Sequence, residues 1–470
     1  METYKNKYFG DKRFYIDVFY LASPIVIQQL ITNFVNMLDN IMVGQIGTYA
    51  MSGVSIANQL ISIFMLAVFG LISAASIYGA QFVGKKDDEN VRNCLYYKLV
   101  AGFFVGLLAI IIVFKEGDRL IGIFMNQNSN TAESISETSR HALSYLRIMS
   151  IGFIPFAFSE SISSTFRENK EAKFPMYISM ATVATNFVFN WILIFGKLGF
   201  PAYGSVGAAV ATIISRFVEL FLNIMICYKS RFRFKFLQGF LNKFHIEKDL
   251  FAEITRNGVP LIINELLYSI GLAAITHAYS FRGIDSIAAY NITATIINLF
   301  FVFAMAMGSC ISILVGQKLG AGHIEDAVIT NSRLTVLALI VSIFAGLILA
   351  LTRGVFPQLY NTSDYVKEIA GRMIMIGGLT LWIAALYNCA YYTLRCGGKT
   401  IITLLFDSVG SLLVTVPVAY FLAIKTDLNV VYMYLAIRLT DIYKVLLGLY
   451  LVKKRIWVNN LVNEKETVES

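Results

Sequence analysis

Four side chains in the first half of the sequence carry oxygen atoms inside otherwise apolar stretches, namely Asp39, Asn186, Asn190 and Thr212. Asn186 and Asn190 are four residues apart, so on a helix their amides project from one face. Carboxylate, amide and hydroxyl oxygens are ligands for small hard cations, and a carboxylate can also bind a proton. The four residues therefore predict a site for Na⁺ or a proton. The alternative is that each asparagine only joins two helices by a hydrogen bond.

Asp39 lies near the end of the apolar stretch from Leu21 to Gly47. Gln28, Thr32, Asn36 and Asp39 follow one another at i, i+4, i+8 and i+11, which places them in one polar stripe on a helix. A charge near the middle of a membrane costs roughly 2.5–3.5 kcal/mol on insertion scales. We therefore expect this stripe to face protein or water, with Gln28, Thr32 and Asn36 lining a substrate cavity.

Glu265 is a second candidate for ion handling. Glu265, Ser269 and Thr276 follow at i, i+4 and i+11, so they form a polar stripe on another predicted helix. We expect Glu265 to be a second, inequivalent ion-responsive site, a protonatable switch in preference to a strong sodium site. The alternative is a structural glutamate that is hydrogen-bonded to neighbouring helices.

Two pairs of opposite charge lie three residues apart in apolar stretches, Arg216 with Glu219 and Arg438 with Asp441. Side chains at i and i+3 of one helix are neighbours, so each pair can neutralise itself. We interpret both as structural ion pairs that hold helices together. A direct part in ion handling is the alternative.

Tyrosines in the second half of the chain could bind flat organic cations by stacking and by cation–π contact. Candidates for the wall of a substrate cavity are Tyr268, Ser269, Tyr290 and Tyr387. In a helical bundle such residues more often belong to the core. Three further polar residues could line the cavity or could be satisfied buried groups: Glu160, His277 and Asp407.

The composition identifies the class of protein that positions these residues. Of 470 residues, 57% are hydrophobic and 15% are charged, and the mean hydropathy is +0.64. In an average soluble domain about a quarter of the residues are charged. Apolar runs of about 20 residues or more, separated by short polar loops, are typical of membrane-spanning helices. We therefore expect an all-α, multi-pass integral protein of the cell membrane.

About twelve spans are predicted, near residues 17–44, 52–84, 92–114, 139–166, 175–196, 205–228, 258–281, 286–319, 331–352, 367–394, 400–423 and 430–452. Lysine and arginine concentrate in the connections on the side of the N-terminus, so both termini are expected to be cytoplasmic. This rule also explains the net charge of +9 without a nucleic-acid partner. The five cysteines lack metal-ligand spacing and are expected to be small core residues.

The chain contains an internal repeat. A shift of 236 positions places Pro24 on Pro260 and, without a gap, Gly47 on Gly283. Such a repeat predicts two similar six-helix lobes, with the substrate between them. We expect an N-lobe at 1–228, a cytoplasmic linker at 229–257 and a C-lobe at 258–470. Because a proline removes one helix hydrogen bond, Pro24 and Pro260 are expected to be hinges.

The basic and aromatic linker, which contains SRFRFKF, is expected to lie on an anionic membrane leaflet, with a specific regulatory site as the alternative.

Several stretches together resemble the multidrug and toxic compound extrusion (MATE) family, in the superfamily that also contains polysaccharide and lipid flippases. The stretches are DNIMVGQIG after the first span, AQFVGKKD and GQKLGAGHIEDA after the second and eighth, TFRENKEAKFP and TLRCGGKT after the fourth and tenth, and the run from Asn186 to Thr212. The resemblance covers about Lys12 to Arg455. It implies drug efflux coupled to inward flow of Na⁺ or protons, through two six-helix lobes around a central cavity.

By motif, the resemblance assigns Asp39, Asn186, Asn190 and Thr212 to an N-lobe cation site and Glu265 to the C-lobe. Two positions depart from the family pattern. Asn190 stands where one branch has an aspartate. No carboxylate lies between Glu368 and Asp407, where another branch has a second C-lobe acid.

The leading hypothesis is a monomeric secondary antiporter that exports hydrophobic, cationic small molecules and needs no cofactor apart from its coupling ion. A flippase of a lipid-linked or polysaccharide precursor is the alternative on the same fold, and it would need unpaired basic residues in the cavity. A membrane enzyme has little support, because the sequence lacks HExxH, GxSxG and a Walker motif. The missing ATP-binding motif indicates that an ion gradient supplies the energy.

Overall fold

The computed structural model describes residues 7–123, 132–239 and 246–463. Within these ranges all regular structure is helical, which confirms the predicted all-α class. The chain divides into two compact units. Unit 1 contains residues 1–26, 80–87 and 254–470, and unit 2 contains residues 27–79 and 88–253.

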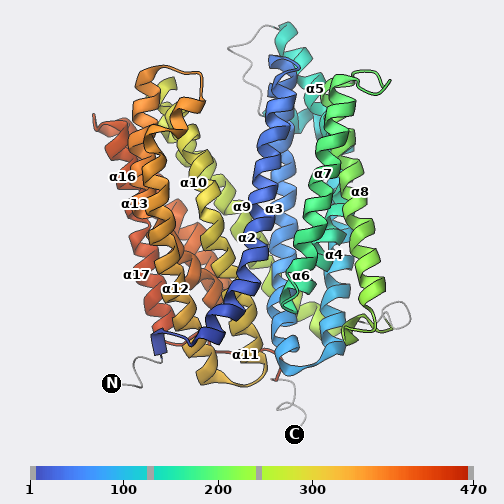
Figure 1. Cartoon of the computed structure of the whole chain (residues 1–470). Coiled ribbons are helices and arrows are strands. Elements are labelled where there is room, and N and C mark those ends of the chain that lie inside the picture. The colour runs from blue at the N-terminus through green and yellow to red at the C-terminus, as the bar shows by residue number, and fades with distance from the viewer. Residues whose placement is uncertain (1–6, 124–131, 240–245, 464–470) are drawn as a thin grey trace. The chain divides into compact units, whose positions relative to one another are not determined.

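Unit 2 is built from α3 (Thr48–Lys85), α4 (Asp88–Ile123), α5 (Ala132–Ser150), α6 (Phe153–Glu168), α7 (Lys173–Phe195) and α8 (Gly204–Ser230). The closest packing is between α7 and α8, and α6 packs against both α4 and α8. A Cβ at Gly207 in α8 would lie 2.5 Å from the carbonyl oxygen of Leu193 in α7, so only glycine permits this approach. Figure 1 shows α7 and α8 running side by side.

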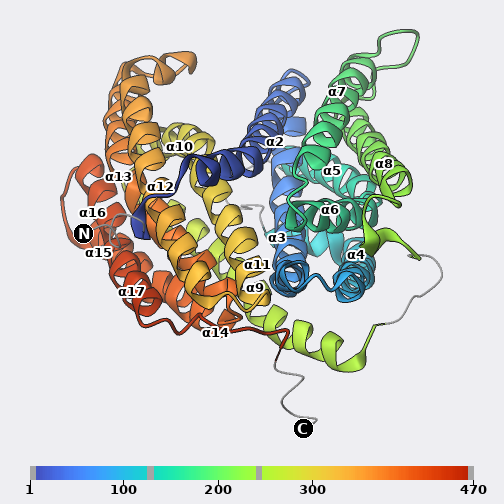
Figure 2. The same ribbon diagram turned by 60° about the horizontal axis from the view of Figure 1, so that its bottom comes forward.

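Unit 1 contains α9 (Lys248–Ser280), α10 (Ile284–Cys310), α11 (Gly316–Gly320), α12 (Ile324–Leu351), α13 (Asp364–Cys396), α14 (Thr400–Leu404), α15 (Val416–Lys425), α16 (Val430–Thr440) and α17 (Ile442–Lys453). Helix α13 is the central helix, because it packs against α10, α12, α16 and α17 (Figure 2). Its neighbours enclose an apolar core that includes Met373, Ile374 and Met433. Two π-helical turns, Leu405–Val409 and Ser411–Thr415, separate α14 from α15.

Among the residues that the structure describes, ten helices are long and apolar enough to span a membrane, and an eleventh span arises if a pair bent by 49° is counted as one. The bent pair is Ile135–Ser150 with Phe153–Glu168, which corresponds to the predicted span at 139–166. The predicted span at 430–452 is divided at Asp441 into α16 and α17. Two of the twelve predicted spans are therefore broken helices.

The division into units differs from the predicted lobes at three places. Helix α2 (Lys12–Gly44) belongs to unit 1 up to Val26 and to unit 2 from Ile27, just after Pro24. The end of α3, residues 80–85, belongs to unit 1. Most of the predicted linker belongs to unit 2, because Phe236 and Leu237 are buried and the Phe236 ring packs against Phe166.

The shift of 236 positions also places Gln81 on Gln317 and Gly84 on Gly320, and these segments, at the ends of α3 and α11, meet inside unit 1. A Cβ at Gly84 would lie 1.8 Å from the carbonyl oxygen of Gln317, and a Cβ at Gly320 would lie 1.9 Å from that of Gln81. The contact is thus reciprocal, and it requires glycine at both repeat positions.

The C-terminal segment covers the same place. The buried Gln81 side chain donates to the carbonyl oxygens of Cys396 (3.0 Å) and Asn459 (3.3 Å) and accepts from the Leu461 amide (2.8 Å). Arg455 forms two contacts with Glu325 at the start of α12, at 2.6 and 3.2 Å. Trp457 and Val462 are buried, so this segment packs onto unit 1.

Candidate cation and substrate sites

The four oxygen-bearing residues of the predicted cation site come together in unit 2. The Asn190 amide nitrogen donates to Asp39 Oδ1 at 2.6 Å and to Asn186 Oδ1 at 3.0 Å. The Asn186 amide nitrogen donates to Thr212 Oγ1 at 3.2 Å, and Thr212 donates to the carbonyl oxygen of Ala208 at 3.0 Å. Helices α2, α7 and α8 thus each supply part of one hydrogen-bonded chain.

The two asparagines are oriented by this chain. Asn190 is 1% exposed, and its amide nitrogen lies between two oxygen acceptors, which fixes which end of the side chain is nitrogen. Its Oδ1 atom is buried and has no hydrogen-bond partner among the described residues. An orphaned buried oxygen beside a carboxylate is unfavourable unless a cation or another donor satisfies it.

A small hollow lies next to this hydrogen-bonded chain, within unit 2. Its lining is mostly aromatic, aliphatic and methionine side chains from α3, α5, α6 and α8: Ile61, Phe64, Met65, Met149, Gly152, Phe153, Phe156, Thr212, Ile213 and Arg216. Thr212 belongs both to the hollow and to the chain that ends at Asp39. The stacked rings of Phe64 and Phe153, 4.0 Å apart, form one of its walls.

Arg216 is the charged residue in the lining of this hollow. It donates to Glu219 at 2.9 Å, the contact predicted for an i, i+3 pair on one helix. Its guanidinium also lies 4.8 Å from the centre of the Phe156 ring. Arg216 is therefore already paired with Glu219.

The remaining residues of the Asp39 stripe make contacts of their own. Gln28 donates to Ser179 in α7 at 2.9 Å, and the Thr32 hydroxyl donates to the Gln28 carbonyl oxygen at 3.0 Å. Neither residue is in the lining of the hollow, so their predicted place in a cavity wall stays a prediction. The Asn36 side chain lies outside the described residues.

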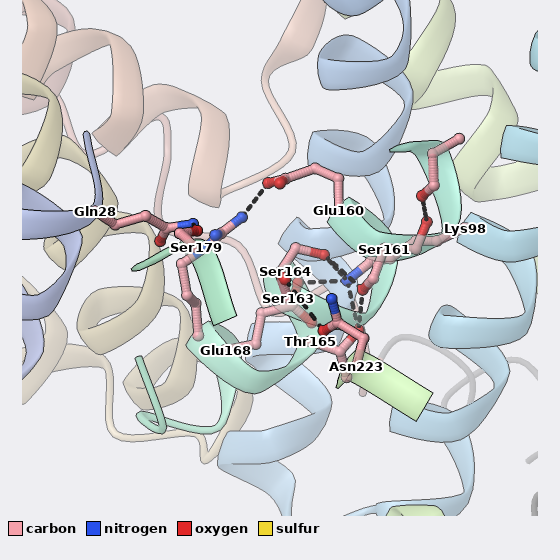
Figure 3. Close-up of polar contacts among 12 residues, drawn as sticks. Gln28, Lys98, Glu160, Ser161, Ser163, Ser164, Thr165, Glu168, Ser179 and Asn223 are labelled. Atoms are coloured by element: carbon pink, nitrogen blue, oxygen red, sulfur yellow. Dashed lines mark hydrogen bonds and ion pairs between the residues drawn. The ribbon is translucent and has the colours of Figure 1, made fainter. Parts of the chain in front are cut away.

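A buried ion pair in unit 2 was not predicted. Lys98 of α4 is 0% exposed and contacts Glu168 of α6, and it also donates to Ser164 (3.0 Å) and Thr165 (3.1 Å). Figure 3 shows this cluster as a group separate from the Gln28–Ser179 contact. The signal in the sequence was Lys98 itself, a charged residue inside the predicted span 92–114.

Figure 3 also shows Glu160, which forms an ion pair with Arg167, seven residues further along α6. Glu160 was a candidate for the cavity wall. Because Arg167 neutralises it, Glu160 fits the alternative role of a polar group satisfied within the protein. His277 likewise has a partner, because its Nδ1 lies 2.8 Å from the hydroxyl of Tyr420.

Glu265 belongs to a second polar network, which lies in unit 1. It accepts from the hydroxyl of Tyr391 at 3.2 Å, and Arg395 donates to the same hydroxyl at 3.0 Å. The Arg395 guanidinium is also 4.0 Å from Glu265 Oε1. Glu265 is 9% exposed and Arg395 is 2% exposed. The predicted second carboxylate therefore has a buried basic residue of the same chain beside it.

Asn264 extends this network to Asp407. Its amide nitrogen lies 3.3 Å from the Tyr391 hydroxyl and 3.3 Å from Asp407 Oδ2, and its oxygen accepts from Ser408 at 2.8 Å. Lys444 donates to Asp407 Oδ1 at 2.9 Å. Asp407 lies in the π-helical turn Leu405–Val409, and such turns occur frequently at functional sites.

The predicted ion pair between Arg438 and Asp441 differs from the observed contacts. Asp441 lies 3.8 Å from Lys444, and Arg438 donates to the hydroxyl of Tyr434 at 3.0 Å. The reason is the break at Asp441, where α16 ends and α17 begins, so i, i+3 spacing does not place the two side chains on one continuous helix.

The candidate cavity residues of the second half all lie in unit 1. Tyr290 stacks on Tyr279 at 4.5 Å and packs against the apolar core. Tyr387 receives a cation–π contact from Lys444, whose Nζ is 4.9 Å from the ring centre. Tyr268 and Ser269 are half-buried. For Tyr290 the core role dominates, and the aromatic face of Tyr387 already has a cation from the chain itself.

Pro24 and Pro260 both lie inside helices, α2 and α9. At Pro24 the boundary between the units follows within three residues. A hinge function of either proline stays a prediction.

Comparison with known proteins decides the family. The sequence model of the MatE family matches residues 24–192 and 260–421, one match in each half of the repeat. The chain belongs to the MatE family. It is 24% identical over 450 residues to the probable multidrug resistance protein NorM of Thermotoga maritima, covering 96% of this chain and 94% of the relative. It is 28% identical to the NorM of Halalkalibacterium halodurans, covering 75% of each chain.

A solved multidrug resistance MATE family transporter of the MOP superfamily, in an outward-facing conformation, has the same fold. The TM-score is 0.84 at 19% identity, covering 94% of this chain and 95% of the other. This MatE protein is thus a multi-pass membrane protein of a multidrug efflux family, as the resemblance implied.

Proposed function

We propose that this protein is a secondary antiporter that exports hydrophobic, cationic small molecules against an inward flow of H⁺ or Na⁺, by alternating access of its two halves. The names of its relatives support multidrug substrates. Alternating access is supported by the internal repeat, because repeat-built transporters bind substrate between their halves. Both termini are proposed to be cytoplasmic. In support, Phe14 contacts Arg333 and Arg455 contacts Glu325, so residues near each end of the described chain contact the same helix, α12.

One observation carries the assignment of the coupling site. Among the described residues, the buried Oδ1 of Asn190 has no hydrogen-bond donor. The same side chain donates to Asp39, so the carboxylate is bonded to a neutral amide. A carboxylate and an amide oxygen suit either a bound proton or Na⁺, with Asn186 and Thr212 holding the amide in position. The cation is a transported substrate here, and no further cofactor is proposed.

The shared position of Thr212 suggests how cation and drug can exclude one another. When a cation neutralises Asp39, the Asn190 amide loses part of its attraction to the carboxylate, and the hydrogen-bonded chain can rearrange. Because Thr212 ends that chain and lines the hollow, the rearrangement alters the wall against which an aromatic drug would pack. A ligand can shift such an equilibrium only by its differential affinity for the two states.

The test is counter-flow in proteoliposomes that contain the purified protein and a fluorescent organic cation. Separate sodium and pH gradients are imposed, with choline replacing sodium and with ionophores as controls. The proposal expects uphill substrate movement with at least one of the two gradients, and the effective gradient identifies the ion. Substrate movement that follows only its own concentration gradient under every condition would show a uniporter and reject antiport.

The flippase alternative has less support. A lipid phosphate needs basic residues that are free to bind it. Arg216, the basic residue in the lining of the hollow, is paired with Glu219. In unit 1 the buried Lys444 is paired with Asp407.

A further inference from the structure

The buried charges of unit 1 balance one another. Two buried acids and two buried bases lie in one group that α9, α13, α17 and the π-helical turn at Asp407 supply: Glu265 and Asp407 with Arg395 and Lys444. A buried carboxylate needs a counter-charge or a proton. In this group a basic side chain of the protein lies next to each carboxylate.

Lys444 has the surroundings of a bound cation. Its ammonium group lies 2.9 Å from Asp407 Oδ1 and 3.8 Å from Asp441 Oδ1. It also lies 4.9 Å from the centre of the Tyr387 ring, at a distance that suits a cation–π contact. Lys444 is 3% exposed and Asp407 is 8% exposed, so the pair is shielded from water.

The second oxygen of Asp407 is also engaged. Asn264, which is 1% exposed, approaches Asp407 Oδ2 at 3.3 Å and is itself held by Ser408. Through the Tyr391 hydroxyl, Asn264 connects Asp407 to Glu265. The two carboxylates therefore share one network, in which Lys444 stands at one end and Arg395 at the other.

Asp39 in unit 2 contrasts with this arrangement. Its described hydrogen bond comes from a neutral amide, and among the described residues no basic side chain lies within 4 Å of its carboxylate. Arg216, the base in the neighbouring hollow, is paired with Glu219. Asp39, Glu265 and Asp407 are the three candidate acids. Among the described residues, Glu265 and Asp407 each have an ion-pair partner and Asp39 has none.

We propose that Lys444 is a resident cation, which fills the place beside Asp407 that a cation from solution would otherwise take. Unit 1 therefore exchanges no coupling ion during transport, and Asp39 in unit 2 is the sole coupling carboxylate. The term coupling ion rests on the proposed antiport. The place of Lys444 beside Asp407 does not, because it can be tested by ion binding without transport.

The test measures ion binding without transport. Purified protein is unfolded by heat in detergent, in 0 or about 300 mM NaCl with choline keeping the ionic strength constant, and in a series from about pH 5.5 to 8.5. A ligand that binds only the folded state raises the unfolding midpoint. All variants carry Asp39→Asn, so that the response of the unit 2 site is removed.

In the Asp39→Asn protein the proposal expects an unfolding midpoint that does not respond to sodium. Adding Lys444→Met leaves Asp407 without its cation, so a sodium or pH response of about 2 °C or more should appear. Adding Asp407→Asn as well removes the carboxylate, and the response should disappear again. Lys318→Met is the matched control, because Lys318 of α11 donates to the neutral Thr330 at 2.7 Å and its loss should create no response.

A sodium response that persists in Asp39→Asn and is lost on adding Glu265→Gln or Asp407→Asn would show that unit 1 takes an ion from solution, and the proposal would be wrong. An Asp39→Asn, Lys444→Met protein that folds without any new ion response would also overturn it. If that variant does not fold, Asp407→Asn in the wild-type background decides, because the proposal expects the wild-type ion response to remain. Failure of antiport in proteoliposomes would leave these outcomes unchanged, so the two proposals fail separately.

Discussion

Asp39 and Asp407 are both aspartates inside apolar helices, yet their neighbours differ in charge. Asp39 accepts from the amide of Asn190, whereas Asp407 accepts from the ammonium of Lys444. A proton or Na⁺ can therefore stabilise the Asp39 carboxylate, whereas Lys444 already stabilises that of Asp407. Residue identity alone would not separate the two, because the difference comes from residues that are distant in the sequence.

At this scale the role of Asn190 can be tested directly. Asn190→Leu removes the orphaned oxygen and the hydrogen bond to Asp39. Losing the Oδ1 ligand should raise the sodium concentration for half-maximal transport about 10-fold. Losing a donor that stabilises the charged carboxylate should instead make proton binding easier, so proton-driven transport should shift to higher pH. The measurement is initial transport rate against sodium concentration or pH.

The control for Asn190→Leu is Asn223→Leu, which removes another buried amide of unit 2, one that donates to the Glu219 carbonyl oxygen at 3.0 Å. It should lower stability and leave the cation dependence of transport in place. Equal effects of the two variants on the cation dependence would mean that Asn190 acts only through stability.

The buried pair of Lys98 and Glu168 gives a stability prediction. Lys98→Met leaves a buried carboxylate without its base and should destabilise the protein by about 3–5 kcal/mol. Lys98→Met combined with Glu168→Gln should recover much of the loss, because no charge then remains buried. Thermal unfolding of the two variants checks this, and a double variant less stable than the single one would contradict it.

At the scale of helices, the unit boundary in α2 supports a hinge at Pro24. Proline removes one backbone hydrogen bond and is a frequent cause of helix bending. The helix passes from unit 1 to unit 2 between Val26 and Ile27. A bend near Pro24 would therefore move the Asp39 end of α2 relative to its start.

Pro24→Ala should restore a donor to the helix and make α2 stiffer. We expect slower turnover, by about an order of magnitude, with substrate affinity nearly unchanged. The measurements are transport rate in proteoliposomes and substrate binding by fluorescence on the same preparation. Wild-type turnover in a variant that binds substrate normally would exclude bending at Pro24 from the cycle.

For the whole molecule, the class of protein and the number of spans could be predicted because length and apolar composition of each helix decide membrane insertion. The break at Asp441 could not, because no proline or glycine lies next to it, whereas Gly152 and Pro155 do accompany the break between α5 and α6. The carboxylates were found as isolated charges in apolar runs. Their partners Lys444, Arg395 and Asn264 were missed, since only the packed fold shows which distant residues meet.

The C-terminal segment was also missed, although the repeat drew attention to Gln81. Gln81→Leu removes three hydrogen bonds between the end of α3 and residues 396–461. Amide hydrogen exchange of a peptide covering residues 456–463 should become at least about 10-fold faster, since exchange follows local opening. An unchanged exchange rate would show that Trp457, which is 1% exposed, holds the segment in place without Gln81.

The most direct test of the central claim is the coupling of Asp39→Asn in proteoliposomes, measured in two assays on one preparation. The account predicts that exchange of labelled for unlabelled substrate continues, while uphill transport driven by an imposed sodium or proton gradient falls to background. Asp39→Glu, which keeps a carboxylate, should retain part of the driven transport. Full gradient-driven transport by Asp39→Asn would contradict the account and place the coupling ion at another residue.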